Sequence, residues 1–154
     1  MTAAIVALCE TVVESINAAA EGMEFPKPVR AVEDYAVAIA QEATNDWTIF
    51  VEPGPSTMTP GTLSGDIREE IAVRLVMHTR CRSDDLPGVK ALLGVVQLAI
   101  DAARDGMDET YNHTGLTYQS SMVDANQIYD AVRLRDDGVF YSDAVLNFEI
   151  LRTP

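Results

Sequence analysis

Apolar side chains near the start of the chain recur with the spacing of an amphipathic helix. They fall at positions i, i+3, i+4 and i+7, which places them on one helical face. The positions are Ile5, Leu8, Cys9, Val12, Ile16, Ala19 and Ala20. Gly22 follows where a helix commonly ends. The pattern therefore predicts a first helix from Thr2 to Glu21.

Strand patterns occupy the middle of the chain. The clearest strand runs from Ile67 to Arg80, where apolar positions alternate with mixed ones, so that one face of the strand is apolar. The apolar positions are Ile71, Val73, Leu75 and Met77. The segment Trp47–Val51 is rich in residues that favour strands and predicts another strand. Val32 and Tyr35 indicate a short strand before it.

A second helix follows the turn "CRSDDLPG". The polar residues 83–85 can cap its free N–H groups, and Pro87 suits its first turn. The helix is predicted to reach Arg104, with Asp105 and Gly106 ending it. Its buried stripe is expected to be Val89, Leu92, Leu93, Val96, Ile100 and Ala103.

The last third of the chain contains one strong pattern and one weak one. Residues 105–124 show little periodicity and predict a long loop that holds a short strand at Gly115–Met122. The segment "DANQIYDAV" predicts a helical turn. In "GVFYSDAVLNFEIL", apolar and polar positions alternate, which predicts a half-buried final strand. Its apolar residues are Ala144, Leu146, Phe148 and Ile150, expected to pack against the stripe of the second helix.

The stretch "EPGPSTMTPGTLSGD" at residues 52–66 predicts a second long loop. It holds three prolines, three glycines and five Ser or Thr residues, and most loops are only about 4–6 residues long. One interpretation is that Met58 and Leu63 contact a neighbouring chain. The other is a surface loop without a partner.

Together these elements predict an α+β fold, with a mostly antiparallel sheet and two main helices packed on one face. The length of 154 residues suits a single domain over 1–154, with long loops at 52–66 and 105–124.

The chain is strongly acidic, with a formal net charge of −13. A protein that binds nucleic acid needs a basic surface, so the charge argues against that class. Nine of the eleven cations are Arg, which reflects either base composition of the coding sequence or a use of Arg at protein interfaces. No uncharged apolar run approaches the length of a membrane span, and the start lacks the basic region of a secretory leader, so we expect a soluble protein.

Catalytic and metal-binding patterns are weak. Cys9 and Cys81 lie far apart, His78 and Cys81 are expected on opposite faces of a strand end, and His113 stands alone. No phosphate-binding, nucleophile-elbow or calcium-loop motif is present. We therefore expect no enzyme activity, no cofactor and no metal site.

Two segments carry a resemblance to a known family. The unit "REEIAVRLVMHTRCRSDDLPGVKALLGVVQLAIDAAR" and the closing "GVFYSDAVLNFEI" resemble the tail terminator proteins of long-tailed bacteriophages, of the lambda type, and related tail-completion proteins. The likeness lies in the pattern and order of elements, and covers about residues 70–104 and 138–151. The greater length at 52–66 and 105–124 departs from the lambda type, so neighbouring contacts there do not carry over.

The resemblance implies a structural virion protein, assembled in the host cytoplasm, that forms a ring of usually six copies. Such a ring caps the phage tail tube, ends its elongation and joins the tail to the head. Its partners would be further copies of itself, the major tail tube protein and the head–tail connector or stopper protein, with DNA only passing through the lumen and no membrane. The acidity then has two interpretations, a lumen wall that repels phosphates or simple solubility.

Six residues are expected to contact neighbouring subunits. They are Met58, Leu63, Arg68, Arg74, Arg80 and Arg82. The arginines are expected to pair with acidic residues of the next subunit, so that replacing Arg74 and Arg80 by Glu weakens the ring and leaves the monomer folded.

Two alternatives stay open at this point. A head-side connector, stopper or other neck protein has a similar size and fold. A small cytoplasmic binding module or an enzyme of unknown type belongs to another class, which a pocket of convergent polar groups would favour.

Overall fold

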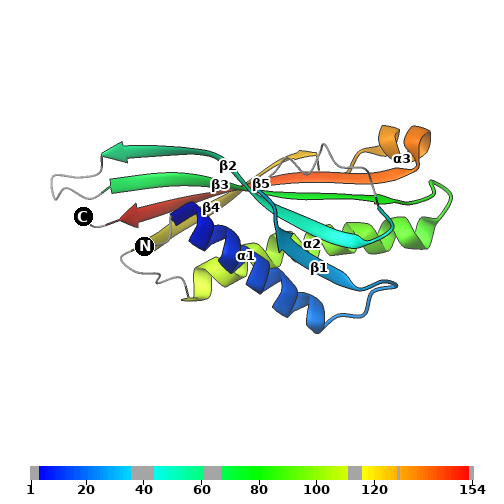
Figure 1. Ribbon diagram of the computed structural model, residues 1–154, viewed down its shortest axis with the longest axis horizontal. Helices are drawn as coiled ribbons and strands as arrows, with labels where there is room; N and C mark the ends of the chain where they lie inside the picture. The colour runs from blue at the N-terminus through cyan, green and yellow to red at the C-terminus, as the bar shows by residue number, and fades with distance from the viewer. Residues whose placement is uncertain (1–3, 36–43, 61–66, 111–115, 128, 153–154) are drawn as a thin grey trace.

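The structure is a computed structural model that describes residues 4–35, 44–60, 67–110, 116–127 and 129–152. Side chains are described within these ranges except at 4, 55–60, 67–69, 106–110, 116–127 and 149–152. The elements in chain order are α1 (Ala4–Glu21), β1 (Val29–Glu33), β2 (Trp47–Pro60), β3 (Ile67–Arg80), α2 (Leu86–Thr110), β4 (Leu116–Gln127), α3 (Ala131–Asp137) and β5 (Val139–Arg152) (Figure 1).

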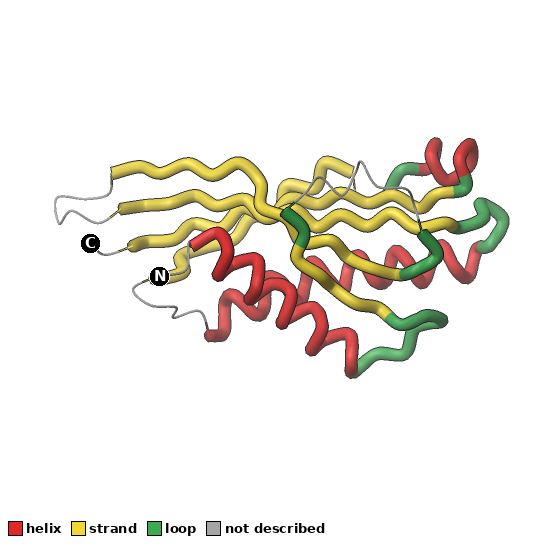
Figure 2. The backbone as a smooth tube through the Cα atoms, in the orientation of Figure 1, coloured by secondary structure: helices red, strands yellow, loops and turns green. Residues whose placement is uncertain are grey.

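The five strands form one sheet in the order β1-β2-β3-β5-β4. The β1–β2 pair is parallel, and the other three pairs are antiparallel. α1 and α2 lie together on one side of this sheet (Figure 2), and their apolar residues share a core with one face of the strands. The predicted α+β fold, with a mostly antiparallel sheet and two main helices on one face, is confirmed.

The core forms where the predicted apolar stripes meet. Ile71, Val73, Leu75 and Met77 of β3 are buried in one cluster with the stripes of both helices. Leu146 and Phe148 of β5 join the same cluster, as expected from the alternation in the final strand. A second, smaller cluster on the opposite face joins Val76 and Tyr141, with Phe50 beside them. The central strands are therefore buried on both faces, which accounts for the mixed rather than polar character of the second face of β3.

The predicted loop at 52–66 is wrong over residues 52–60, which continue β2 in antiparallel pairing with β3. Asp34 donates its N–H to the carbonyl of Val51 at 2.9 Å, on the β1 side. Since backbone groups alternate in direction along a strand, the nitrogen of Pro53 also faces away from β3, and its missing N–H costs no ladder bond. A register shift between Pro53 and Ser56 admits the extra residue of a bulge.

Gly54 lies in this bulge because the backbones approach closely there. A Cβ at Gly54 would lie 2.9 Å from the Cβ of Ala72, which is closer than two carbon atoms can pack. Proline and glycine therefore mark an irregular edge of a strand here rather than a loop. Residues 61–66, including Leu63, lie outside the described residues.

The predicted loop at 105–124 is also wrong over residues 105–110 and beyond the short strand expected within it, and residues 111–115 lie outside the described residues. α2 continues past Gly106 to Thr110, since one glycine costs a helix only about 1 kcal/mol. The short strand expected at Gly115–Met122 is found from Leu116 and extends to Gln127 as β4, paired with β5.

The helical turn expected in "DANQIYDAV" begins only at the last two residues of that segment, at Ala131. Asp130 caps α3 by accepting the N–H of Arg133 at 3.1 Å, and Gly138 ends it with a φ of 64°, the left-handed conformation that favours glycine. The two capping residues enclose seven residues, so they determine a short helix that leads directly into β5.

The outer edge of β1 is closed by a side chain. Asn17 of α1 accepts the N–H of Ala31 at 2.8 Å and donates to the carbonyl of the same residue at 3.2 Å. These two bonds imitate the pairing that a neighbouring strand would make. The Asn17 amide therefore satisfies the middle of this edge strand and ties α1 to the sheet.

We expect Asn17→Ala to lower the free energy of unfolding by about 1–3 kcal/mol, because Ala31 is buried and its backbone groups would lose their partner. Chemical denaturation monitored by circular dichroism measures the change. Glu14→Ala, at an exposed position of the same helix, is the control and should stay within about 0.5 kcal/mol. Equal stability of the two variants would contradict a role for the amide.

Candidate functional site: a buried charge network and two open sheet flanks

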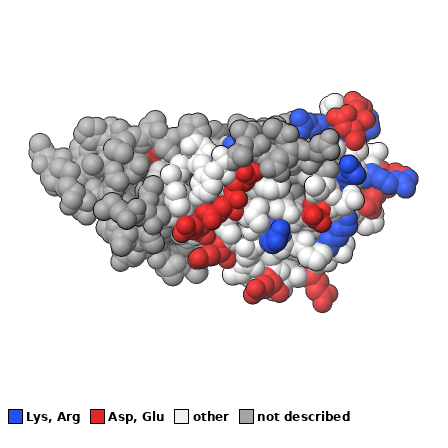
Figure 3. Space-filling model, in the orientation of Figure 1, with Lys and Arg blue, Asp and Glu red and all other residues white. Residues whose placement is uncertain are grey.

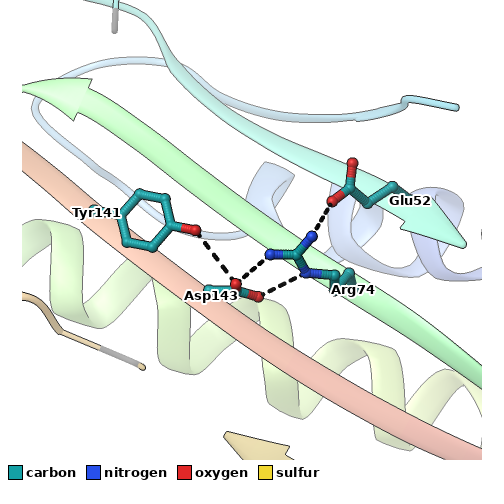
Figure 4. Close-up of polar contacts among 4 residues, drawn as sticks. All are labelled: Glu52, Arg74, Tyr141 and Asp143. Carbon is teal, nitrogen blue, oxygen red and sulfur yellow. Dashed lines mark hydrogen bonds and ion pairs between the residues drawn. The ribbon is translucent and has the colours of Figure 1, made fainter. Parts of the chain in front are cut away.

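A charged network lies on the face of the sheet opposite α1 and α2 (Figure 4). Arg74 of β3 donates through Nη1 to Glu52 Oε1 of β2 at 3.0 Å, and through Nε to Asp143 Oδ1 of β5 at 3.0 Å. Its Nη2 also pairs with the second oxygen of Asp143. Tyr141 donates its hydroxyl to the same carboxylate at 3.3 Å. One guanidinium thus connects three adjacent strands.

The carboxylates of this network are buried. Glu52 is 5% exposed and Asp143 is 9% exposed, whereas the side chain of Arg74 keeps 23% of its surface in contact with solvent. The hydrogen bond from Arg74 to Asp143 raises the pKa of the guanidinium, so it stays charged. Burial, followed by the charge of Asp143, raises the pKa of Tyr141, so its hydroxyl stays protonated and remains a donor.

The arrangement is suited to holding strands in place. Register pairs Glu52 directly with Arg74, and Asp143 lies diagonally across from Arg74 on β5. The guanidinium of Arg133, on α3, lies 4.3 Å from the centroid of the Tyr141 ring, a cation–π contact that connects α3 to the same network. Arg74 contacts both oxygens of Asp143, and this bidentate geometry fixes the position of β3 relative to β5. The same contact neutralises the buried carboxylate.

The structure distributes the five described members of the expected interface set along β3, the turn after it and β2. Met58 and Arg68 lie on adjacent strands at one end of the sheet, where the backbone register pairs Met58 with Glu69 and Arg68 with Thr59. Arg80 lies at the opposite end of β3 and is exposed. Arg82 lies in the turn beyond it, also exposed, and pairs with Asp84 at 2.9 Å. The set therefore does not form one continuous surface, and Leu63 lies outside the described residues.

Arg74 has its carboxylate partners within its own chain. All three of its guanidinium nitrogens contact Glu52 or Asp143. The expectation that Arg74 pairs with an acidic residue of a neighbouring subunit is therefore replaced by an intrachain role, and a substitution at Arg74 acts first on the fold.

The partners of Arg74 were missed from the sequence. The pattern predicts a loop at Glu52, and Asp143 lies in the predicted final strand without a predicted partner. A signal existed, since Arg74 is the one charged residue in the otherwise apolar run 71–77, and Asp143 is an acidic residue inside the final strand. Opposite charges inside two strands of one sheet indicate a buried pair, although the sequence does not show that the strands are neighbours.

The cysteines and His78 form no common site. Cys9 is buried, Cys81 is half-buried, and His78 is buried with its ring centroid 6.1 Å from that of Phe50. Across the described ranges, no group of three or more side chains is arranged to hold a metal ion. His113 lies outside these ranges. A shallow hollow of about 760 Å³ lies where α1 leads into β1, lined in part by Met23, Phe25 and Arg30.

Cys9 gives the fold a dependence on alkaline pH. Burial, then the nearby charges of Glu33 and Glu10, raise the pKa of its thiol from 9.0 to about 12. The protonated thiol is favoured in the folded state, so its contribution to stability is complete below pH 9 and is lost as the pH rises toward about 12. We expect Cys9→Ala to lose less stability than wild type over this interval, measured by urea denaturation at stepped pH. Glu14→Ala, at an exposed position of the same helix, is the control and should keep the wild-type slope; a Cys9→Ala slope equal to wild type would contradict the assignment.

One end of the sheet has two open flanks. It comprises residues 52–60 of β2, 67–74 of β3, 145–152 of β5 and 116–124 of β4, which the register places level with one another; we call it the distal section. β1 pairs with β2 only as far as Val51. Among the residues that the structure describes, no strand pairs with the outer side of β4 or with the outer side of β2 in this section.

The inner residues of the distal section, such as Ile71 and Phe148, pack in the core beneath the helices, whereas its outer end projects beyond the helical layer. In Figure 1, β2, β3 and β5 continue beyond the start of α1 and the end of α2. A sheet end with free edges on both sides presents rows of backbone donors and acceptors, and such edges pair readily with other chains. This section is therefore the main candidate surface for assembly.

Charges on the face shown in Figure 3 are mixed at the end of the molecule that carries α3, where most of the visible Lys and Arg atoms lie beside Asp and Glu. Arg82 pairs with Asp84, and Arg135 pairs with Asp136 at 3.1 Å. This end therefore does not present the single-signed basic surface that duplex DNA selects.

A scan against protein-family models finds no match, and a search of curated proteins finds no similar sequence. Within the described residues, the segment Leu86–Asp105 of α2 is long and apolar enough to cross a membrane by length and composition. Leu92, Val96 and Ile100 of that segment are buried in the core of the protein, and core helices commonly pass the same test.

Proposed function

We propose that this chain is a structural ring protein of the tail terminator class, which caps a phage tail tube and joins it to the head. The order of elements supports the proposal, because a long central strand leads through a capped turn into an apolar helix, and an amphipathic strand closes the chain. These are the two segments on which the resemblance to tail terminators depends. In the two stretches by which the chain departs from that family, the described residues belong to β2, α2 and β4.

The observation that carries the proposal is the distal section with an open flank on each side. When two different edges of one subunit join, the contact is heterologous, and it closes into a ring if the rotation between subunits returns to the start. β4 and the distal half of β2 provide two such edges on opposite sides of the same sheet. A ring in which DNA only passes through the lumen also agrees with the net charge of −13, since an acidic wall repels phosphates.

The proposal is tested by the size and shape of the purified protein. Light scattering should give a mass several times the 16.8 kDa of one chain, about sixfold if the ring resembles its proposed family, and negative-stain electron microscopy should show rings with an open centre. Addition of the purified ring to growing tail tubes should stop their elongation. A strictly monomeric protein at the concentrations of an assembly reaction, or compact particles without a lumen, would contradict the proposal.

A further inference from the structure

We propose that neighbouring copies join by main-chain pairing, in which residues 116–124 of β4 of one copy add to residues 52–60 of β2 of the next copy. The inference rests on the proposed ring and names the surface that forms it. It would make the distal sections one continuous antiparallel sheet around the ring. The occupant of each open flank is thus a second copy of this chain.

Strand direction agrees with this pairing. β2 is antiparallel to β3, β3 to β5, and β5 to β4. β4 and β2 therefore run in opposite directions, and a copy placed beside β4 in the same orientation presents its β2 antiparallel to it. Because antiparallel strands pair through perpendicular hydrogen bonds, the contact continues the existing pattern without reversing a subunit.

The direction of each backbone group follows from three hydrogen bonds. The carbonyl of Val51 accepts from Asp34, the N–H of Arg80 bonds to the carbonyl of Thr44, and the N–H of Cys81 bonds to the carbonyl of Gly138. Since the direction alternates along each strand, even-numbered residues of β3 bond toward β2 and odd-numbered ones toward β5. The residue pairings between β3 and β5 and between β5 and β4 extend this alternation to β4. Met122 and Asp124 then bond to β5, whereas Ser121 and Val123 direct their N–H groups outward.

The two flanks differ in their supply of donors. Pro53 and, after the bulge, Pro60 fall at outward positions of β2, so this flank lacks N–H groups there and keeps its carbonyls. β4 contains no proline and only one charged residue, Asp124, so it lacks the usual devices that protect an edge strand. In a two-fold contact between two β2 strands, both strands would lack N–H groups at their prolines. β4 has no proline, so it offers an N–H group opposite each outward carbonyl of β2.

The other edge of the sheet is closed to this kind of contact. β1 is short, and the amide of Asn17 already occupies the outward N–H and carbonyl of Ala31. An incoming strand would have to displace two hydrogen bonds there. The outer edge of β1 is therefore unfavourable for pairing with another copy. The open edges of the distal section are the better sites for such pairing.

Ser121→Pro tests the inference because it removes an outward N–H without removing a bond to β5. We expect this variant to stay folded by circular dichroism and to lose at least tenfold in ring affinity by sedimentation. Ser121→Thr keeps the N–H and is the matched control, which should form rings like wild type. Rings of wild-type stability from folded Ser121→Pro would overturn the pairing and leave the proposed function intact, whereas a monomeric wild type would overturn the function itself.

Cysteine crosslinking keeps the test decisive if Ser121→Pro does not fold. In a Cys81→Ser background, a chain carrying both Met58→Cys and Ser121→Cys should give a ladder of crosslinked species with a short bis-maleimide. Each single variant should stay uncrosslinked, because each contact needs one residue from each flank. Dimers from Ser121→Cys alone would show a two-fold contact of β4 with itself, and no crosslinking of the double variant in intact rings would place the interface elsewhere; both results contradict the inference.

Discussion

Replacing Arg74 by methionine is expected to lower the free energy of unfolding by about 3–5 kcal/mol, because it leaves two buried carboxylates without their cation. Glu52 and Asp143 are each less than a tenth exposed. Water therefore cannot fully replace the hydrogen bonds that they lose. Arg74→Lys should recover only part of the loss, since an ammonium keeps the charge but not the fork that contacts both carboxylates. Denaturant unfolding of the three proteins measures the series.

The control for Arg74 is Arg82→Met. Arg82 also pairs with a carboxylate, at 2.9 Å, but its side chain is 84% exposed, and an exposed pair of this kind contributes about 0–1 kcal/mol. The difference between the two variants therefore isolates the effect of burial. If Arg74→Met and Arg82→Met were equally mild, the network would be a surface feature, and its assignment as the tie between β2, β3 and β5 would be wrong.

Phe148→Ala is expected to have a similarly large effect, about 3–5 kcal/mol, through loss of core volume. Phe148 is 1% exposed and pairs with Ile71 across β3 and β5, within the cluster that receives the stripes of both helices. For a chain of this length the melting temperature should fall by roughly 6–20 °C. Asn147→Ala, the half-buried next position on the same strand, is the control. An unchanged melting temperature for Phe148→Ala would mean that β5 is peripheral to the core.

Both variants act on the strands from which the distal section projects. Arg74 lies at the inner limit of that section, where Glu52, Arg74, Val145 and Asp124 are level across four strands. A network that fixes these strands would also hold the two open flanks at a constant separation, which a closed ring requires of every subunit. For any mutation in the network, the free energy of unfolding should therefore be measured before its effect on ring assembly is interpreted.

Elements whose apolar pattern repeats with one period can be predicted from the amino-acid sequence alone. α1, α2, β3 and β5 all follow this rule, and their predicted bounds agree with the structure to within a few residues except at the end of α2. The reason is local: the face that enters the core is set by a spacing of 3.6 residues in a helix and 2 in a strand. The choice of an α+β fold followed from these four elements, since two one-sided helices and two long strands have few ways to bury their apolar faces.

The distal half of β2, the extent of β4 and the charge network depend on contacts between strands that are far apart in the chain. Whether proline is compatible with a strand depends on which side its nitrogen faces, and that depends on the neighbouring strands of Pro53. β4 has little pattern of its own and is a strand because β5 pairs with it. The carboxylates that Arg74 holds lie 22 and 69 residues away in the chain. Each of these features is a relation between strands, and a periodicity within one strand carries no information about its partner.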